Sequence, residues 1–254
     1  EGMDIRALEV GSRVLVDASL CLIIEALPEN EAQRFVVAEI PAVTFADIGG
    51  HDSLIGEIER KLVTPLLHPE LYKKIGLNAP RGFIMHGPPG VGKTMIAKAI
   101  VSRMNEILSR NGGRARGHFM HIGGPELQSK WVGETERQMR ELFNQARKIA
   151  SPESPVIIFF DEAEAMFPVR GSGISSDVEK TNVTQFTALL DGLEERGNII
   201  VILATNRFDL IDRAVTRPGR CDKVIQVPRP DEEGARTIFK KYLRPEEGQV
   251  HPRY

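Results

Sequence analysis

The chain has few cysteines, no long apolar run and no excess of basic residues, the features that are typical of disulfide-rich, zinc-binding, membrane-spanning or nucleic-acid-binding proteins. Its 254 residues include two cysteines, Cys21 and Cys221, and one tryptophan, and the net charge is −2. Two cysteines exclude a disulfide framework or a cysteine-rich zinc site, and they fit a reducing cytoplasm. No apolar run reaches the roughly 20 residues that span a bilayer, and no basic excess attracts nucleic acid or anionic lipid. We therefore expect a cytoplasmic protein whose partners are neither membranes nor nucleic acids.

The chain does have enough apolar residues, 41%, to form a sizeable core. From residue 51 onward, short apolar runs alternate with segments of helical periodicity, which predicts an α/β fold with a parallel sheet between two layers of helices. Strands are expected in the runs GFIMHG, HFMHI, PVIIFFDE, NIIVILATN and KVIQV, the last at an edge of the sheet. Helices are expected over residues 52–64, 92–109, 135–150, 178–195 and 231–243.

The residues before this α/β region follow a different pattern. Residues 1–40 are β-rich, and the run RVLVDASLCLIIEAL predicts two strands, too few to bury a core of their own. They are either the docked edge of a larger sheet or the remainder of a truncated domain. Residues 41–50, PAVTFADIGG, are expected to be a linker, because proline and paired glycines interrupt regular structure there.

The run HGPPGVGKT, between a predicted strand and a predicted helix, is the clearest chemical signal in the sequence. It matches the phosphate-binding pattern G-x-x-x-x-G-K-S/T, in which glycines let backbone N–H groups surround phosphates at the positive end of a helix. Lys93 is expected to reach the β- and γ-phosphates of ATP, and Thr94 to ligate Mg²⁺. The residues expected to bind the nucleotide here are Gly87, Pro88, Pro89, Gly90, Val91, Gly92, Lys93, Thr94 and Met95.

Polar side chains end two of the predicted buried strands. Asp161 follows the run VIIFF and is placed to hold Mg²⁺ through its water shell, and Glu162 is placed to polarise an attacking water. Because a nucleotide kinase does not need the second acid, the pair favours hydrolysis of ATP over phosphoryl transfer. Asn206 ends the run ILATN, where it either orients the same water or caps the following turn, and we prefer the first role.

Two histidines, His118 and His121, lie three residues apart in the predicted strand HFMHI. Residues three apart in a strand point to opposite faces of the sheet, so the two imidazoles are not expected to share a metal. The sequence also has no HExxH pattern, and we expect no metal held by histidine.

Five segments in the same order resemble the AAA+ ATPases, in the AAA clade proper: ADIGG, GPPGVGKT, FFDEAEAMF, ATNRFDLID and TRPGRCD. The resemblance covers residues 44–243. It implies the three-layer P-loop NTPase fold, preceded here by the short β-rich segment. It also implies that Asp47, Ile48 and Gly49 lie near the adenine of the nucleotide.

The same resemblance assigns roles to residues further along the chain. Asn206 is the expected sensor of the γ-phosphate, and Arg217 and Arg220 are the expected pair of arginine fingers. A guanidinium from a neighbouring subunit neutralises charge that develops on the γ-phosphate during hydrolysis. The alternative for both arginines is a local surface salt bridge.

The single tryptophan, Trp131, lies in the run KWVGETER, where the family carries the first pore loop. The resemblance implies that an aromatic residue, an aliphatic residue and a glycine grip a polypeptide threaded through a hexameric ring. The expected pore loop is Lys130, Trp131, Val132 and Gly133, and residues 169–173 resemble a second pore loop. The alternative is that Trp131 packs in a core or at a subunit interface.

Two further segments, RGSGISSDVE and ALPENEAQRFVVAEIPAVTFADIGG, are similar to the actinobacterial proteasome-associated ATPases. That group implies a homo-hexamer that unfolds proteins tagged with the modifier Pup and feeds them to a 20S proteasome. Residues 1–40 are then the C-terminal part of an OB-type β-barrel domain, and residues 51–254 the large AAA+ subdomain. The small helical lid, the coiled coil and the Gln-Tyr-Leu tail of that group are not found, so we expect a fragment or a divergent relative.

Other functions of the same superfamily stay open. The chain is alternatively a protein-remodelling ATPase without a proteasome partner, a nucleic-acid remodeller, or a module that binds ATP without turnover. Nucleic-acid translocation needs basic loops, and Lys130 and Arg170 alone do not form a basic channel. The pair of Asp161 and Glu162 argues against a module that only holds ATP.

Overall fold

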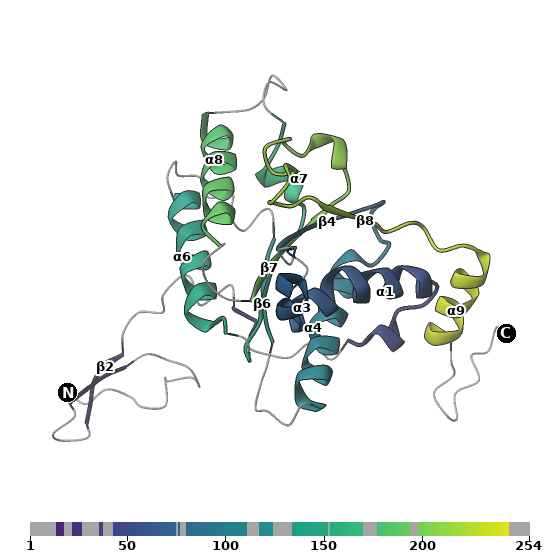
Figure 1. Cartoon of the computed structure of the whole chain (residues 1–254), viewed down its shortest axis with the longest axis horizontal. Helices are drawn as coiled ribbons and strands as arrows, with labels where there is room; N and C mark the ends of the chain where they lie inside the picture. The colour runs from purple at the N-terminus through teal and green to yellow at the C-terminus, as the bar shows by residue number, and fades with distance from the viewer. Residues whose placement is uncertain are drawn as a thin grey trace.

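The described part of the chain is built on a six-stranded β-sheet with helices on both faces (Figure 1). The computed structural model describes residues 14–17, 22–26, 36–37, 43–74, 76, 80–110, 117–123, 134–151, 153–169, 177–193 and 198–243. The strand order is β3–β5–β6–β7–β4–β8. The parallel strands are β4 (Gly82–His86), β5 (His118–Ile122), β6 (Val156–Phe160), β7 (Ile199–Thr205) and β8 (Lys223–Gln226).

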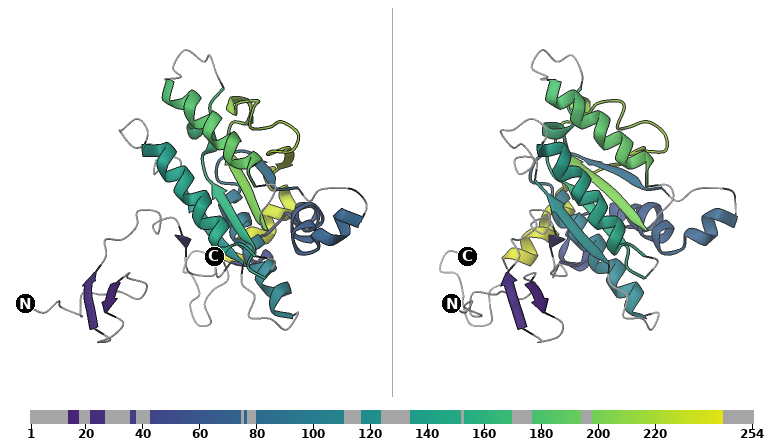
Figure 2. Two further views of the ribbon diagram at one scale, coloured as in Figure 1. Left: turned by 60° about the vertical axis from the view of Figure 1, so that its left-hand side comes forward. Right: turned by 90° about the vertical axis from the view of Figure 1, so that its left-hand side faces the viewer.

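Helices form the two outer layers (Figure 2). One face of the sheet is covered by α6 (Glu134–Ile149) and α8 (Asp177–Asp191), which pack against each other. The other face is covered by α1 (Asp52–Ile58) and α4 (Lys93–Arg110). Further elements are the 3-10 helices η3 (Phe45–Asp47) and η5 (Phe208–Leu210), the short helix α7 (Ala163–Met166) and helix α9 (Glu232–Tyr242).

Strand β6 shows why an unbroken apolar run becomes a strand at the centre of this fold. All five of its side chains are fully buried, and successive side chains point to opposite faces. Val156, Ile158 and Phe160 belong to the core under α6 and α8. Ile157 and Phe159 belong to the core under α1 and α4. The expected three-layer α/β fold is therefore confirmed.

The five predicted strands and four of the five predicted helices are confirmed within a few residues, but the helix predicted over 52–64 is different. After α1 the chain forms a π-helical turn, η4 (Glu59–Val63), then α2 (Thr64–Leu67) and α3 (Pro69–Lys74). Pro65 has no N–H to continue the α-helical hydrogen bonds. The hydroxyl of Thr64 donates to the carbonyl of Glu59 at 2.9 Å, which satisfies one acceptor of the altered turn.

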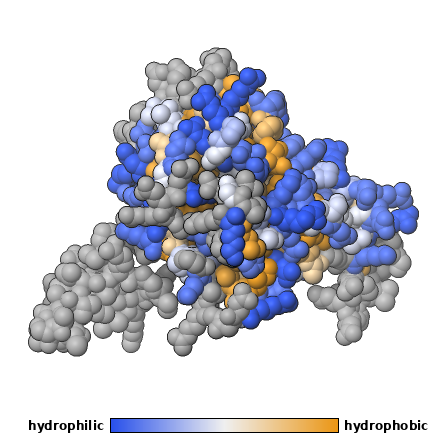
Figure 3. Space-filling model, viewed as in Figure 1, coloured by the Kyte–Doolittle hydropathy of each residue, from blue (hydrophilic) through white to orange (hydrophobic). Residues whose placement is uncertain are grey.

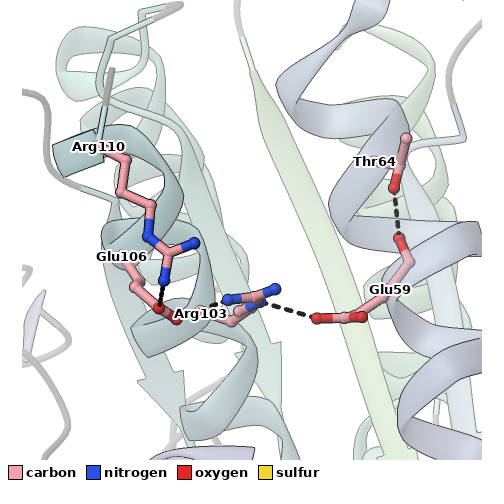
Figure 4. A network of polar contacts seen from close by, with 5 residues as sticks. All are labelled: Glu59, Thr64, Arg103, Glu106 and Arg110. Carbon is pink, nitrogen blue, oxygen red and sulfur yellow. Dashed lines mark hydrogen bonds and ion pairs between the residues drawn. The ribbon is translucent and has the colours of Figure 1, made fainter. Parts of the chain in front are cut away.

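The π-helical turn faces the helix that follows the phosphate-loop pattern (Figure 4). Arg103 of α4 donates from Nε to Glu59 at 2.8 Å and from Nη1 to Glu106 at 2.7 Å. Arg110 pairs with the other oxygen of Glu106. This network ties η4 to α4 by polar contacts beside their apolar packing.

Before residue 43 the described residues form three short strands. β1 (Val14–Asp17) pairs antiparallel with β2 (Leu22–Ala26) in a sheet of their own. β3 (Val36–Val37) pairs antiparallel with β5, so residues 36–37 lie at the edge of the large sheet. The boundaries expected at residues 40 and 50, and the OB-type origin of the first segment, stay predictions.

The surface seen in Figure 3 is hydrophilic over much of the described region, with apolar atoms between the polar side chains. The large apolar side chains exposed within the described ranges are Leu71, Phe208, Leu210, Val224, Phe239 and Leu243. Among the helices that the structure describes, none combines the length and apolar character required to cross a membrane.

Candidate nucleotide site

The phosphate-loop pattern folds into a turn between the end of β4 and the start of α4. Gly90 and Gly92 have φ angles of 78° and 90°, a region that side-chain-bearing residues rarely adopt. Gly87 has a different constraint, because a Cβ atom there would lie 2.1 Å from the carbonyl oxygen of Val227. The glycines of the pattern therefore serve both the curvature of the loop and its close packing beside β8.

Lys93 is buried at the first position of α4, with 7% of its surface exposed. Its Nζ donates to the carbonyl oxygens of Gly87 and Pro88, both at 2.9 Å, and to Oδ1 of Asn206 at 2.8 Å. Burial lowers the pKa of Lys93, while the negative charges of Asp161 and Glu164 act to raise the pKa. The three acceptors match the three protons of an ammonium group, so the arrangement suits the charged form.

Thr94, the next residue, joins α4 to the end of β6. Its hydroxyl donates to Oδ2 of Asp161 at 2.7 Å. The backbone N–H of Asp161 donates to the carbonyl of Ile122 at 2.8 Å, which fixes the aspartate beside β5. A hydroxyl and a carboxylate are oxygen ligands of the kind that Mg²⁺ prefers, so this pair fits the ion that the sequence predicts.

Glu162 has a strained backbone. Its φ and ψ angles are 52° and 45°, and it is the only non-glycine residue with positive φ in the described part of the chain. Its backbone N–H donates to Oδ1 of Asp161 at 3.0 Å, and its side chain is exposed. A left-handed backbone at a non-glycine residue persists only where the surrounding structure imposes it, and such strain clusters at functional sites.

Asn206, the predicted sensor, directly follows β7 and contacts Lys93 of the phosphate-loop pattern. The sequence left two roles open for Asn206: orienting the attacking water or capping the turn after β7. If Asn206 capped the turn, its side chain would hydrogen-bond to the backbone of that turn. The N–H of Arg207 donates to the hydroxyl of Thr205 at 3.0 Å, whereas the side-chain oxygen of Asn206 accepts from Lys93. This geometry favours the role at the phosphate loop.

Glu164 is a residue that the sequence analysis missed. Its Oε1 accepts the backbone N–H of Asn206 at 3.2 Å, and its Oε2 is buried without a hydrogen-bond partner. The residue lies in α7, two positions after Glu162, and its charge acts on Lys93. A third carboxylate in the run DEAE was the available signal, but the sequence alone does not show that it reaches the neighbouring strand.

The residues expected near the adenine lie in η3 and just after it. The side chain of Asp47 accepts hydrogen bonds from the N–H and the hydroxyl of Thr44, both at 2.8 Å, which closes the 3-10 turn. η3 packs against α4, and Ile48 is buried in the same core cluster. A Cβ atom at Gly49 would lie 2.9 Å from Ile238 of α9, so this glycine lets α9 approach.

Gly50 makes an even closer contact with α9. A Cβ atom at Gly50 would lie 2.4 Å from Cα of Gly234, so the two backbones cross with no room for side chains. The sequence indicated a break at Gly49 and Gly50 but did not identify the glycine opposite them.

The two expected arginine fingers differ in their surroundings. Arg220 donates from Nε and Nη2 to the two oxygens of Asp191, at 2.8 and 2.6 Å, and from Nη1 to the carbonyl of Ala214 at 2.8 Å. The hydrogen bond from Arg220 lowers the pKa of Asp191 and the same bond raises the pKa of Arg220. Arg217 is exposed, and no hydrogen bond or ion pair of its side chain occurs within the described residues.

The position of Arg220 separates it from the phosphate loop of its own chain. A Cβ atom at Gly82, the first residue of β4, would lie 2.5 Å from the carbonyl oxygen of Arg220 and 2.7 Å from Cα of Cys221. The phosphate loop begins at the other end of β4, and five residues of a strand extend roughly 13 Å. The arginine loop therefore lies at the amino end of β4, and the phosphate loop lies at its carboxyl end.

The expected pore residues Lys130, Trp131, Val132 and Gly133 lie outside the described residues, as do residues 170–173 of the second expected pore loop. Their roles stay predictions. The described residues contain no cluster of three or more His, Cys, Asp or Glu side chains that could hold a metal.

A parallel sheet with a glycine-rich loop at the start of a buried helix, a lysine, a threonine and a strand-end aspartate define a P-loop nucleotide-binding domain. The chain belongs to the ATPase family associated with various cellular activities (AAA), whose profile matches residues 83–229. The family resemblance stated from the sequence is thereby confirmed.

Curated relatives cover most of this chain. It is 48% identical over 240 residues to the proteasome-associated ATPase of Acidimicrobium ferrooxidans, covering 94% of this chain and 42% of the relative. It is 45% identical over 255 residues to the protein of the same name from Jonesia denitrificans, covering 99% and 46%. It is 48% identical over 233 residues to an AAA ATPase forming ring-shaped complexes from Corynebacterium efficiens, covering 92% and 44%. The chain thus spans less than half the length of these relatives.

Proposed function

We propose that this chain is the nucleotide-hydrolysing part of a cytoplasmic, ring-forming ATPase that unfolds proteins and moves them through a central pore. The relatives named as proteasome-associated ATPases support delivery of the unfolded chain to a proteasome. The relative named for ring-shaped complexes supports the homo-oligomeric ring. A hexamer, Pup-tagged substrates and the 20S proteasome belong to the proposal through the resemblance.

One observation carries the proposal: groups from three strand ends and one helix start meet through hydrogen bonds. Lys93 joins the loop after β4 to Asn206 after β7, and Thr94 joins α4 to Asp161 after β6. The carboxyl edge of a parallel sheet is where ligands bind in open α/β folds. The arrangement suits the triphosphate of ATP better than a neutral ligand, because backbone N–H groups and a lysine favour an anion.

Each residue of the site then has a distinct role. The loop from Gly87 to Thr94, followed by Met95, surrounds the phosphates, with Asp47, Ile48 and Gly49 near the adenine. Thr94 and, through water, Asp161 hold Mg²⁺, which when bound neutralises charge on the phosphates. Glu162 accepts a proton from the attacking water, and Asn206 orients that water against the γ-phosphate.

The arginines complete the site of a neighbouring subunit. Arg220 lies at the end of β4 opposite to its own phosphate loop, so its guanidinium is suited to a site on another chain. Arg217, exposed in the same loop, is suited to the same role. Lys130, Trp131, Val132 and Gly133 form the pore loop in this proposal, where the aromatic face contacts the substrate chain.

The test is ATP turnover per subunit as a function of protein concentration, together with Mg²⁺-dependent unfolding of a folded reporter carrying an unstructured tail. We expect specific activity to rise with concentration, because the finger is supplied by a neighbour. Trp131→Ala is expected to abolish unfolding while ATP turnover continues. Turnover that is flat with concentration would contradict the ring, and unfolding that survives Trp131→Ala would contradict the pore loop.

A further inference from the structure

His121 of β5 places a ring nitrogen near the aspartate proposed to hold Mg²⁺. Its Nε2 atom lies 3.9 Å from Oδ2 of Asp161, the same oxygen that accepts the hydrogen bond from Thr94. This nitrogen is buried and has no hydrogen-bond partner. A buried polar atom without a partner carries a free-energy cost, so its position calls for a physical reason.

Aromatic packing determines where the His121 ring lies. Its centroid is 6.2 Å from that of Phe119 and 5.5 Å from that of Phe159, and both phenylalanines are buried. Phe119 and His121 lie two residues apart in β5, so their side chains point to the same face, and His121 lies opposite Phe159 on β6. The three rings therefore share the sheet face that α4 covers, and Thr94 lies in the first turn of α4.

We propose that His121 is a positioning residue for the carboxylate of Asp161. On this proposal, which rests on the proposed function, Nε2–H donates to Oδ2 of Asp161 when nucleotide and Mg²⁺ bind, and fixes the oxygen that Thr94 also contacts. A movement of about 1 Å brings the pair within hydrogen-bond range. One carboxylate oxygen can accept both donors, because each oxygen has two lone-pair positions.

The role requires no change in protonation. The neutral ring with its proton on Nε2 and the charged ring both present a donor at this atom. Groups that hydrogen-bond to a metal-binding side chain commonly orient it and raise affinity for the ion. The competing explanation is that His121 fills space between two phenylalanines and that its nitrogen has no part in binding.

The test compares nucleotide affinity with and without Mg²⁺. Calorimetry gives the Kd of ADP in Mg²⁺ and in EDTA for wild type, His121→Phe, His121→Gln and His118→Phe. Phenylalanine keeps the ring and removes the donor, whereas glutamine keeps an N–H donor at a similar reach. His118 lies on the same strand but three residues away, on the opposite face, and serves as the matched control.

His121→Phe is expected to weaken binding in Mg²⁺ by roughly three- to tenfold, the effect of one lost hydrogen bond, and to leave binding in EDTA unchanged. His121→Gln is expected to restore most of the loss, and His118→Phe to bind as wild type does. If His121→Phe does not fold, His121→Met replaces it, because methionine keeps similar volume without a donor.

Three results would overturn the proposal: wild-type Mg²⁺ dependence in His121→Phe, an equal loss in Mg²⁺ and EDTA, or no recovery in His121→Gln. Wild type that binds ADP equally in both buffers would overturn the proposed Mg²⁺ site as well. A Mg²⁺ effect that is present in wild type and unchanged in His121→Phe would overturn only the role of His121.

Discussion

The two ends of strand β4 carry different kinds of site. At the carboxyl end, Lys93 donates to Asn206 and the adjacent Thr94 donates to Asp161, all within a single chain. At the amino end, Arg220 is held by Asp191 and Ala214, with no contact to the phosphate loop. In the proposed function the first end binds the nucleotide of its own chain, whereas Arg220 at the second end, which the structure pairs with Asp191, acts on the nucleotide of a neighbouring chain. If the proposal holds, one domain supplies the phosphate site and depends on a neighbour for turnover.

The largest expected effect is on ATP turnover, when the arginine is inactivated in one subunit and Glu162 is inactivated in another. Arg220→Ala is expected to lower ATP turnover by roughly 10³-fold, the typical contribution of an arginine finger. Glu162→Gln inactivates the other end but keeps Arg220. Mixing the two inactive variants is expected to restore turnover, because some sites then pair an intact Glu162 with an intact Arg220. The measurement is ATPase activity across mixing ratios.

The control for this experiment is Arg213→Ala, which removes an exposed arginine from the same loop and is expected to retain wild-type turnover. No recovery in any mixture, with both variants shown to assemble, would mean that the arginine acts within its own chain or not at all.

The next effect in size concerns Glu162 at the carboxyl end. Glu162→Ala and Glu162→Gly are both expected to lower turnover by roughly 10²-fold or more, because the proton acceptor is lost. Only Glu162→Gly relieves the left-handed backbone, so it is expected to be more stable than Glu162→Ala by about 0.5–1 kcal/mol. Urea unfolding measures the difference. Equal stability of the two variants would show that the backbone at residue 162 carries no strain.

A smaller effect is expected at the two glycines near the ends of β4, Gly82 as its first residue and Gly87 directly after it. A Cβ atom at Gly82 would contact the backbone of Arg220, and one at Gly87 would contact the carbonyl of Val227. Each substitution by alanine is expected to destabilise the fold by about 1–3 kcal/mol through overpacking. Gly87→Ala should also weaken nucleotide binding, whereas Gly82→Ala should lower turnover at unchanged nucleotide affinity.

Gly56→Ala is the matched control, because its Cβ would lie 3.5 Å from only the tip of Arg60. It is expected to be neutral or to stabilise the helix by about 0.5–1 kcal/mol. Equal changes in nucleotide affinity in Gly82→Ala and Gly87→Ala would contradict the claim that only the carboxyl end of β4 binds the nucleotide.

The smallest effect is expected away from both ends, in the network around Arg103. Its partners Glu59 and Glu106 are partly exposed, so Arg103→Met is expected to cost less than about 1 kcal/mol and to leave nucleotide affinity unchanged. The difference should shrink at high salt, where surface charges are screened. Arg236→Met, which removes a more exposed pair with Glu232, is the control and should cost still less.

Much of the fold and the phosphate site could be predicted from the sequence, because both depend on local spacing. The run VIIFF is buried on both faces as its composition predicts, and Asp161 follows at the strand end. Several contacts that the sequence did not predict arise between segments far apart in the chain. Gly82 beside Arg220, Gly50 beside Gly234 and Glu164 beside Asn206 depend on how closely the backbones approach.

The π-helical turn at Glu59–Val63 escaped prediction for a different reason. Apolar spacing in residues 52–64 fits an α-helix, because Leu54, Ile58 and Leu62 recur every four residues and all three are buried. Pro65 and Thr64 were the local signals, but neither specifies this turn by itself.

Strand β4 also limits how this domain can vary. Between Gly82 and Gly87 the chain is hydrogen-bonded to β7 on one side and to β8 on the other. Adding or removing one residue would turn every later side chain to the wrong face and would pull one glycine out of its close contact. Insertions in surface loops are generally tolerated, whereas an insertion within β4 would disturb its pairing with both neighbouring strands. The separation between the phosphate loop and the arginine loop is therefore fixed by chain geometry rather than adjusted by sequence.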